Sequence, residues 1–333
     1  MKFSLRKKIL SVTPMRASRH FAKGIKLKRY GNLSLYRFFN IFFFNISDDE
    51  IFARANGVSY TLILAIFPAI IFLFTLIPYI TVYFPDINRE SIMQFMGEMM
   101  PPSMYEVASS TVLDIISNQR GGLLTFGFVF ALFLATNGML ALMRAFNACY
   151  KTVDKRNIWK MRLTATGLTL MLALSLFLAI VLLVVGQIVV NYVATHLQDF
   201  SNLNLDSFTI YLLLGLRFAV IFIVFFFAIS FIYYFGPAVH YNWKFFSIGS
   251  WIATLGCLGV SYGFSYYVTN FGSYNKVYGS IGALIALMVW IQLLTVVLLF
   301  GYEINASLHY GMKMMEIDKY KKHKVKKEVT SNR

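Results

Sequence analysis

Six long apolar stretches constrain the fold of this chain more than any other feature of its 333 residues. Each contains about 22–28 residues, and as an α-helix would be about 33–42 Å long, enough to cross a bilayer core of about 30 Å. In hydrocarbon, backbone N–H and C=O groups must be satisfied within the protein, which favours helices. The sequence therefore predicts an all-α, polytopic membrane bundle with six transmembrane helices. These helices are expected at residues 58–83, 122–143, 163–190, 209–235, 246–269 and 281–305.

The composition agrees with a membrane bundle. Hydrophobic residues make up 58% of the chain and charged residues only 14%, whereas a soluble domain carries about 25% charged residues. The two cysteines, Cys149 and Cys257, lie far apart and form no metal-binding or redox spacing. We expect both to be small buried apolar side chains.

Lys and Arg are distributed unevenly around the six stretches. Residues 1–54 carry twelve, residues 144–162 carry six and the segment after residue 306 carries eight, whereas residues 191–208 carry none. By the positive-inside rule, 27 of the 31 Lys and Arg residues fall on the cytoplasmic side. Both termini are therefore predicted to be cytoplasmic. The formal net charge of +16 then reflects topology, and no nucleic-acid partner is expected.

The chain divides into a basic cytoplasmic tail at residues 1–32, a transmembrane domain at 33–310 and a second basic cytoplasmic tail at 311–333. Residues 33–52 are aromatic-rich and too short to span, so they predict an interfacial helix. Residues 86–120 place apolar side chains at helical spacing among acids, which predicts two amphipathic helices covering the outer mouth of the bundle. A mobile lid and a plain capping loop both fit this segment.

Five residues within the spans or directly beside them are candidates for a substrate path: Arg217, Asn56, Tyr60, Pro68 and Asn137. Arg217 lies about eight residues into the fourth span, roughly 12 Å deep, where an arginine costs about 3 kcal/mol. We expect a hydrated cavity at Arg217 that suits an anionic substrate or a lipid phosphate. Helices broken by proline often line transporter cavities. The alternatives are an Arg217 bonded to neighbouring carbonyls and proline kinks that are ordinary membrane architecture.

A carboxylate follows some twenty apolar residues in the last span. Glu303 costs free energy there unless it is paired or hydrated. Arg54 and Arg144 are expected at a similar depth, so the hypothesis is that Glu303 pairs with one of them. The alternative is that all three side chains reach water separately.

Small residues mark the last two spans as helix-packing elements. Gly256, Gly259 and Gly263 fall at i, i+3 and i+7, and Gly279 and Gly282 begin a bare face on the last stretch. Bare faces allow two helix backbones to approach closely within lipid. We therefore predict a tight antiparallel hairpin of the fifth and sixth spans, with glycine face against glycine face.

The sequence shows no clear catalytic or cofactor chemistry. Its five histidines are scattered, and no His-x-x-x-His, Gly-x-Ser-x-Gly or Walker motif is present. No metal and no cofactor is expected, and the chain is predicted not to be an enzyme.

Motifs at both ends of the bundle resemble the YihY/virulence factor BrkB family. The closing signature consists of Tyr278-Gly-Ser-Ile-Gly-Ala, Trp290 and Leu299-Phe-Gly-Tyr-Glu-Ile-Asn-Ala306, and the opening one of Ala55-Asn-Gly-Val-Ser-Tyr60 with Phe67-Pro68. Asn147, Tyr150 and the Tyr234-Phe-Gly-Pro237 turn with Trp243 also fit, so the resemblance covers roughly residues 35–310.

The resemblance implies a six-helix inner-membrane protein of bacteria with no settled biochemical activity. Members of the family have carried a ribonuclease BN label, and virulence and transport roles, including movement of lipids or envelope components, are suggested for them. Three hypotheses follow: a transporter-like protein for an anionic or amphipathic substrate, a membrane scaffold, and, least favoured, a membrane-bound ribonuclease. Membrane lipids are the expected partners, and a homo-oligomer is left open.

Overall fold

A computed structural model describes residues 23–27, 30–48, 50–80, 120–196, 206–238, 244–270 and 280–331, with a few isolated positions between 90 and 114. Most of the predicted outer segment at 86–120 and most of the predicted tail at 1–32 therefore lie outside the described residues. The elements are two short strands and seven helices in this part of the chain. They are β1 (Lys26–Leu27), β2 (Leu33–Ser34), α3 (Leu35–Asp48), α4 (Ile51–Ile80), α7 (Gly121–Cys149), α8 (Ile158–His196), α9 (Asp206–Phe235), α10 (Ile248–Asn270) and α12 (Ser280–Ser331).

The helical membrane fold predicted from the apolar stretches is confirmed. Each of the six stretches corresponds to a helix, and five of the described helices are long and apolar enough to cross a membrane. The remaining helix, α10, has 23 residues and carries small or polar groups such as Gly249, Ser250 and Thr254 on its inner turns. These small and polar side chains lower the hydropathy of α10. Such side chains suit contacts with neighbouring helices rather than with lipid.

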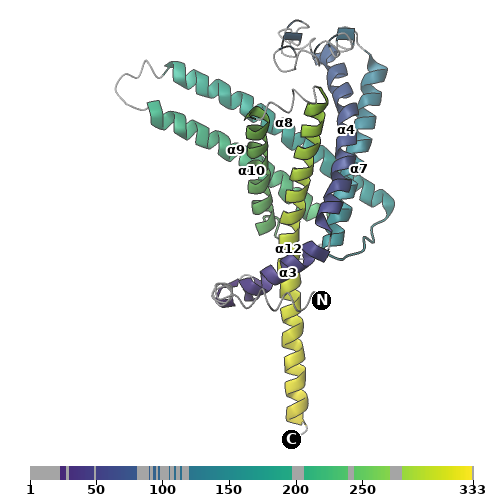
Figure 1. The fold of residues 1–333 in the computed structure, drawn as a ribbon, viewed down its shortest axis with the longest axis vertical. Coiled ribbons are helices and arrows are strands. Elements are labelled where there is room, and N and C mark those ends of the chain that lie inside the picture. Colours follow the sequence, from purple (N-terminus) through teal and green to yellow (C-terminus); the bar gives the residue numbers. More distant parts are fainter. Residues whose placement is uncertain are drawn as a thin grey trace.

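The longest helix, α12, is the axis of the structure (Figure 1). It contacts α10, α4, α3 and α7, while α4 and α7 form a closely packed pair beside it (Figure 1). Helices α8 and α9 pack against each other as a long hairpin that leans away from this body. The bundle therefore consists of a central body around α12 and a side arm made of α8 and α9.

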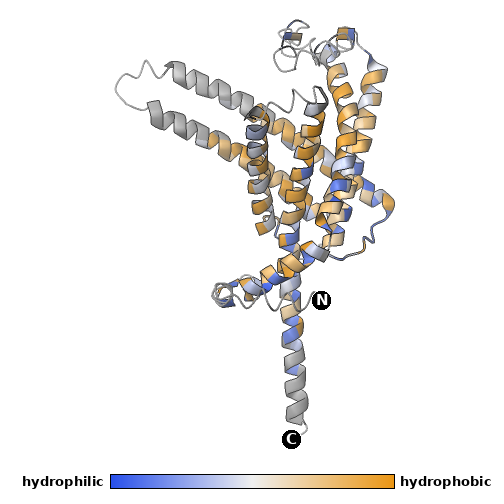
Figure 2. Ribbon diagram, viewed as in Figure 1, coloured by the Kyte–Doolittle hydropathy of each residue, from blue (hydrophilic) through white to orange (hydrophobic). Residues whose placement is uncertain are grey.

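Helix α12 has 52 residues and continues without a break through residue 310, the predicted end of the membrane domain, to Ser331. At 1.5 Å per residue it is about 78 Å long, more than twice the bilayer core. Figure 2 shows apolar residues along α4, α7 and the first part of α12, and hydrophilic residues toward the end where α3 crosses α12. Much of the predicted basic tail is thus helical.

Part of the predicted N-terminal tail is also folded. Strands β1 and β2 pair antiparallel, with Lys26 opposite Ser34 and Leu27 opposite Leu33. Leu33 is fully buried and packs with Phe38 and Leu308. The predicted interfacial helix is α3, whose end lies against α12. The start of the domain is thereby attached to the second half of the central helix.

Aromatic packing fixes the centre of the body. Phe146 of α7 stacks on Tyr302 of α12 with ring centroids 4.3 Å apart, and Tyr233 of α9 meets Phe146 edge-on at 5.5 Å. The Tyr233 hydroxyl donates a 2.6 Å hydrogen bond to the Leu298 carbonyl. Aromatic pairs contribute about 0.5–1.5 kcal/mol each beyond the area they bury. Three helices are therefore joined at one level of α12.

The fifth and sixth spans pack closely, but the closest approach is at residues the glycine pattern did not include. A Cβ on Gly249 would lie 2.1 Å from the Gly301 carbonyl oxygen, and one on Gly301 would lie 2.6 Å from the Ala253 Cβ. Gly256 faces Val297 at 2.7 Å, whereas among the described atoms nothing lies within 4 Å of a Cβ on Gly259 or Gly263. Gly282 is buried, and Gly279 lies outside the described residues. The two helices thus approach each other most closely near Gly249 and Gly301. No described atom packs against the Cβ positions of Gly259 and Gly263.

Candidate functional site: a polar seam along α12

A buried carboxyl group joins α3 to α12. Glu303 is fully buried. Its Oε1 accepts a 2.8 Å hydrogen bond from Asn45 Nδ2 and a 2.7 Å hydrogen bond from Ser307 Oγ. Ser307 lies one turn after Glu303 on the same helix, so two residues of α12 and one of α3 form a small polar cluster. Hydrogen bonds to a carboxylate are about twice as strong as those between neutral groups, which offsets part of the cost of burial.

A second polar contact lies on the same face of α12, closer to its start. Gln292 Nε2 donates a 2.8 Å hydrogen bond to Asn56 Oδ1 of α4, and both side chains are exposed. Gln292 precedes Glu303 by eleven residues. The two residues are therefore about 16 Å apart along the α12 axis, and they point from that axis in directions about 20° apart. We call these five residues the polar seam: Asn45, Asn56, Gln292, Glu303 and Ser307.

The seam runs between apolar helices. Phe52 of α4 meets Phe300 of α12 edge-on, with ring centroids 5.8 Å apart, between the two polar contacts. Tyr60 lies one turn after Asn56 on α4, and its side chain is 62% exposed. Pro68 is buried within α4, which continues through it. Two of the predicted path residues, Asn56 and Tyr60, therefore lie on one exposed face of α4, whereas Pro68 does not share it.

The remaining path candidates lie elsewhere. Asn137 of α7 accepts a 2.8 Å hydrogen bond from Arg162 Nη1 of α8, and this guanidinium lies 5.1 Å from the centre of the Phe133 ring. Arg217 falls within α9, but its side chain lies outside the described residues. The cavity expected at Arg217 stays a prediction.

The predicted partners of Glu303 lie on two different helices. Arg54 is half-buried on α4 and Arg144 is exposed on α7. Asn45 and Ser307 each donate a hydrogen bond to the carboxyl. Ion pairing with either arginine stays a prediction. Asn45 was missed from the sequence, because it is 258 residues from Glu303 within a phenylalanine-rich run.

On the opposite side of α12, Asn305 fastens the start of α10. Its Oδ1 accepts a 2.9 Å hydrogen bond from the Gly249 backbone N–H, and its Nδ2 donates a 2.8 Å hydrogen bond to Ser247 Oγ. These bonds satisfy groups at a helix N-terminus that would otherwise lack partners. They require the α10 backbone to approach α12 closely, which the lack of a side chain at Gly249 permits.

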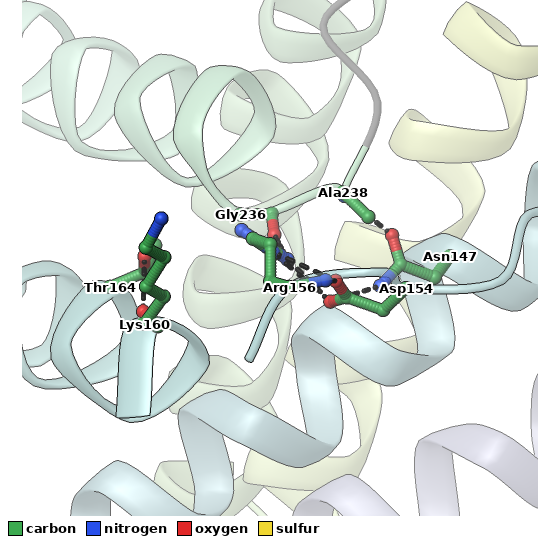
Figure 3. Close-up of polar contacts among 7 residues, drawn as sticks. All are labelled: Asn147, Asp154, Arg156, Lys160, Thr164, Gly236 and Ala238. Carbon is green, nitrogen blue, oxygen red and sulfur yellow. Dashed lines mark hydrogen bonds and ion pairs between the residues drawn. The ribbon is translucent and has the colours of Figure 1, made fainter. Parts of the chain in front are cut away.

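A second polar cluster joins the loop between α7 and α8 to the end of α9 (Figure 3). Arg156 forms a 2.7 Å ion pair with Asp154 and donates a 2.9 Å hydrogen bond to the Gly236 carbonyl. Asn147, at the end of α7, donates to Asp154 Oδ2 at 3.2 Å and accepts a 2.7 Å hydrogen bond from the Ala238 N–H. We call these residues the polar clasp. Lys160 and Thr164, also drawn in Figure 3, make a separate bond within α8.

The clasp predicts a pH-dependent stability. The hydrogen bond from Arg156 holds the pKa of Asp154 below its usual value of about 4, although desolvation opposes this shift. A carboxyl whose pKa is lowered by folding stabilises the fold above its unfolded pKa, and this contribution is lost as pH falls through the folded pKa. The melting temperature in detergent should therefore fall more between pH 5 and 3 for the wild type than for Asp154→Asn.

Asp318→Asn is the matched control, because Asp318 forms an exposed ion pair with Arg37 that contributes little. It should keep the wild-type pH profile. A wild type and an Asp154→Asn variant with parallel profiles would show that the clasp does not act through this carboxyl.

Among the described residues, no group of three His, Cys, Asp or Glu side chains is arranged to hold a metal ion. Cys149 and Cys257 are both buried, and they form no disulfide with each other. The polar groups of the seam and clasp are amides, hydroxyls, the Glu303 carboxyl and the Arg156–Asp154 ion pair. Such groups bind polar or charged ligands and fasten helices.

These features define a polytopic helical membrane protein with a polar seam along its central helix. The sequence profile of the family described as "Virulence factor BrkB" matches residues 42–328. The chain belongs to this family, as the closing and opening motifs indicate.

Named relatives match over most of their length. The "Putative ribonuclease-like protein YfkH" of Bacillus subtilis is 32% identical over 80% of this chain and 94% of its own. A "UPF0761 membrane protein" of Alteromonas mediterranea is 24% identical over 84% of this chain and 90% of its own. A second UPF0761 membrane protein, from Mannheimia succiniciproducens, is 21% identical over 85% of this chain and 93% of its own. No solved structure matches the chain significantly.

Proposed function

We propose that this protein is a transporter-like protein of the bacterial inner membrane that moves an anionic or amphipathic envelope component, a lipid in the first instance. One observation carries the proposal: the exposed hydrogen-bonded pair of Asn56 and Gln292 lies within the apolar spans of α4 and α12. Exposed amides are costly against acyl chains, because hydrocarbon offers them no further hydrogen-bond partners.

Polar groups on an exposed, membrane-facing surface can form hydrogen bonds with a lipid headgroup that passes them. A headgroup moving along the polar seam would find amide donors and acceptors at the level of Gln292 and again at the level of Asn45. Its acyl chains would remain in the lipid beside α4. Polar residues at membrane depth commonly mark such pathways.

The orientation of the chain in the membrane and the outer half of the substrate path follow from the predicted topology. Both termini are cytoplasmic, since 27 of 31 Lys and Arg residues fall on that side of the predicted topology. Arg217 and the segment at 86–120 would serve the part of the path toward the outer leaflet, and Asn137, which is bonded to Arg162, would serve the cytoplasmic half. The basic cytoplasmic regions suit anionic headgroups of membrane lipids.

The test is a lipid translocation assay in proteoliposomes, with fluorescent phospholipid and an external quencher. The double variant Asn56→Leu/Gln292→Leu should lower the translocation rate about tenfold, because two amides that bind the passing headgroup are lost. Thr125→Val is the matched control. It removes an exposed polar group from α7, where the Thr125 hydroxyl donates to the Gly121 carbonyl of its own helix. Equal rates with and without wild-type protein would refute the proposal.

A scaffold is the second candidate, and a specific observation favours it. The bonds of Asn305, Tyr233 and the polar clasp all fasten one helix to another. A scaffold would leave translocation at the protein-free rate while the variants lose stability. We further propose that the protein is not a ribonuclease, whatever the name of its Bacillus relative. Purified protein that cleaves RNA, with the activity following the protein through purification, would overturn this.

A further inference from the structure

A cavity of about 250 Å³ lies where α3, the end of α7 and α12 meet. Its polar lining consists of Asn40, Asn45, Tyr150, Lys151 and Tyr310. Its apolar lining comes from the same three helices and includes Phe44 and Met314. Pockets for drug-sized ligands measure about 300–1,000 Å³. This cavity therefore has room for a small polar group, but not for an acyl chain as well.

The cavity borders the polar seam through Asn45. The side chain of Asn45 lines the cavity and also donates to Glu303 Oε1. Tyr150, which also lines the cavity, hydrogen-bonds to His309 of α12. These bonds hold two polar walls of the cavity in place, so the site is formed before any ligand arrives. A preformed site loses less entropy on binding.

Lys151 is held over the cavity by an unusual backbone. Its φ is 51°, in the left-handed region that glycine favours. The Lys151 N–H bonds to the Ala148 carbonyl, and the Thr152 N–H to the Asn147 carbonyl, both at 2.9 Å. This pair of bonds is the Schellman motif, in which glycine normally occupies the position of Lys151. A lysine at a position where glycine would be more stable indicates that its side chain has a use.

The residues around the cavity suit a position at the membrane surface. The Lys151 ammonium lies 5.8 Å from the centre of the Phe44 ring, at the rim. Phe39, Phe43 and Phe44 of α3 are 42%, 64% and 57% exposed, which gives this helix an apolar outer face. Aromatic amphipathic helices of this kind lie at the level of lipid headgroups. The cation of Lys151 then lies at the level of lipid phosphates.

We propose that this cavity binds the phosphate of an anionic phospholipid headgroup, with Lys151 as its cation and the Asn40 and Tyr310 side chains as hydrogen-bonding groups. The inference rests on the proposed function, since it supplies the cytoplasmic site at which a lipid joins the polar seam. The acyl chains would lie outside, along the exposed phenylalanines of α3. Phosphate and lysine form charge-assisted hydrogen bonds, the strong class for such recognition.

The experiment titrates full-length protein in detergent micelles with phosphatidylglycerol and counts bound lipid by native mass spectrometry. Lys151→Gln should weaken binding about tenfold, and Lys151→Arg should retain it. Lys151→Gly should weaken binding equally while raising the melting temperature by about 2 °C, because glycine relieves the left-handed backbone. Lys155→Gln, which removes an exposed positive charge from the same connection, is the control and should bind like the wild type.

Two further arms identify the source of the phosphate. Phosphatidylcholine should bind more weakly than phosphatidylglycerol, and inorganic phosphate at millimolar concentration should not displace the lipid. Displacement by inorganic phosphate would make the site one for free phosphate and overturn the lipid assignment. Binding unchanged in both Lys151→Gln and Lys151→Gly would overturn the site itself. Because binding is measured without translocation, a protein that binds but does not translocate lipid would refute only the transport proposal.

Discussion

Replacing Gly249 with leucine is expected to cost at least about 3 kcal/mol of unfolding free energy, the largest effect among the variants considered. A Cβ at this position would lie 2.1 Å from the Gly301 carbonyl oxygen and 2.6 Å from the Asn305 side chain. The α10 backbone would have to move away from α12 and would lose the Asn305 hydrogen bond to the Gly249 N–H. Equilibrium unfolding of purified protein in mixed micelles measures this change.

Gly259→Ala is the matched control, because nothing among the described residues lies within 4 Å of its Cβ position. Alanine is a better helix former than glycine by about 0.8–1.0 kcal/mol, so this variant should be as stable as the wild type or slightly more so. Gly249→Ala should fall between the two. If Gly259→Ala destabilised the protein as much as Gly249→Ala, the close contact would extend along the whole glycine face, as the sequence pattern predicts.

Replacing Glu303 with leucine should cost about 2–4 kcal/mol and loosen α3 from α12. The Asn45 amide and the Ser307 hydroxyl both donate to Glu303 Oε1 within the protein, and leucine offers them no acceptor. Each buried donor left without a partner costs about 1–3 kcal/mol. Chemical unfolding gives the free energy, and protease cleavage within α3 reports the release of that helix.

Glu303→Gln separates a hydrogen-bonding role from an ion-pairing role. Glutamine keeps an acceptor oxygen for Asn45 and Ser307 but removes the charge. A variant within about 1 kcal/mol of the wild type would favour hydrogen bonding as the main role. A loss as large as that of Glu303→Leu would support the predicted ion pair with Arg54 or Arg144, because the hydrogen bonds would remain and only the charge would be lost.

Hydropathy alone identified the fold class, because crossing a bilayer demands only length and apolarity from a segment. The unbroken α12 was not foreseen. Its apolar stretch ends near residue 305, which marks where the chain leaves the membrane, but the residues that follow are polar and helix-forming, so no sequence signal marks the end of the helix itself. The paired strands β1 and β2 were missed for a different reason, since two-residue strands leave no periodic pattern.

The packing between α10 and α12 shows why residue spacing does not fix a helix contact. Gly256, Gly259 and Gly263 have the spacing of a bare face, yet the closest approach involves Gly249 and Gly301. Spacing identifies a candidate face, but the height at which two faces meet depends on their partners. Here the Asn305 bonds to Ser247 and Gly249 set that height.

The sequence located two of the five residues of the polar seam. Asn56 and Glu303 were predicted because polar side chains in or beside an apolar span are costly unless they have a partner or a function. Asn45 was missed because it lies in a segment expected on the membrane surface, outside the bundle. Ser307, one turn after Glu303, was the available signal for a polar face that continues along α12. Lys151 carried no sequence signal, because its importance lies in a backbone angle that only the folded chain shows.

The length of α12 gives the protein a lever. A straight helix of about 78 Å transmits tilt along its whole axis, so a rotation of about 5° around its middle moves each end by about 3 Å. A force on the basic end of α12 therefore moves Gln292, about 20 Å from the middle of the helix, by about 2 Å against α4, whereas Glu303 lies close to the pivot and stays in place. Mechanical coupling of this kind needs no hinge, since rigidity alone carries the displacement.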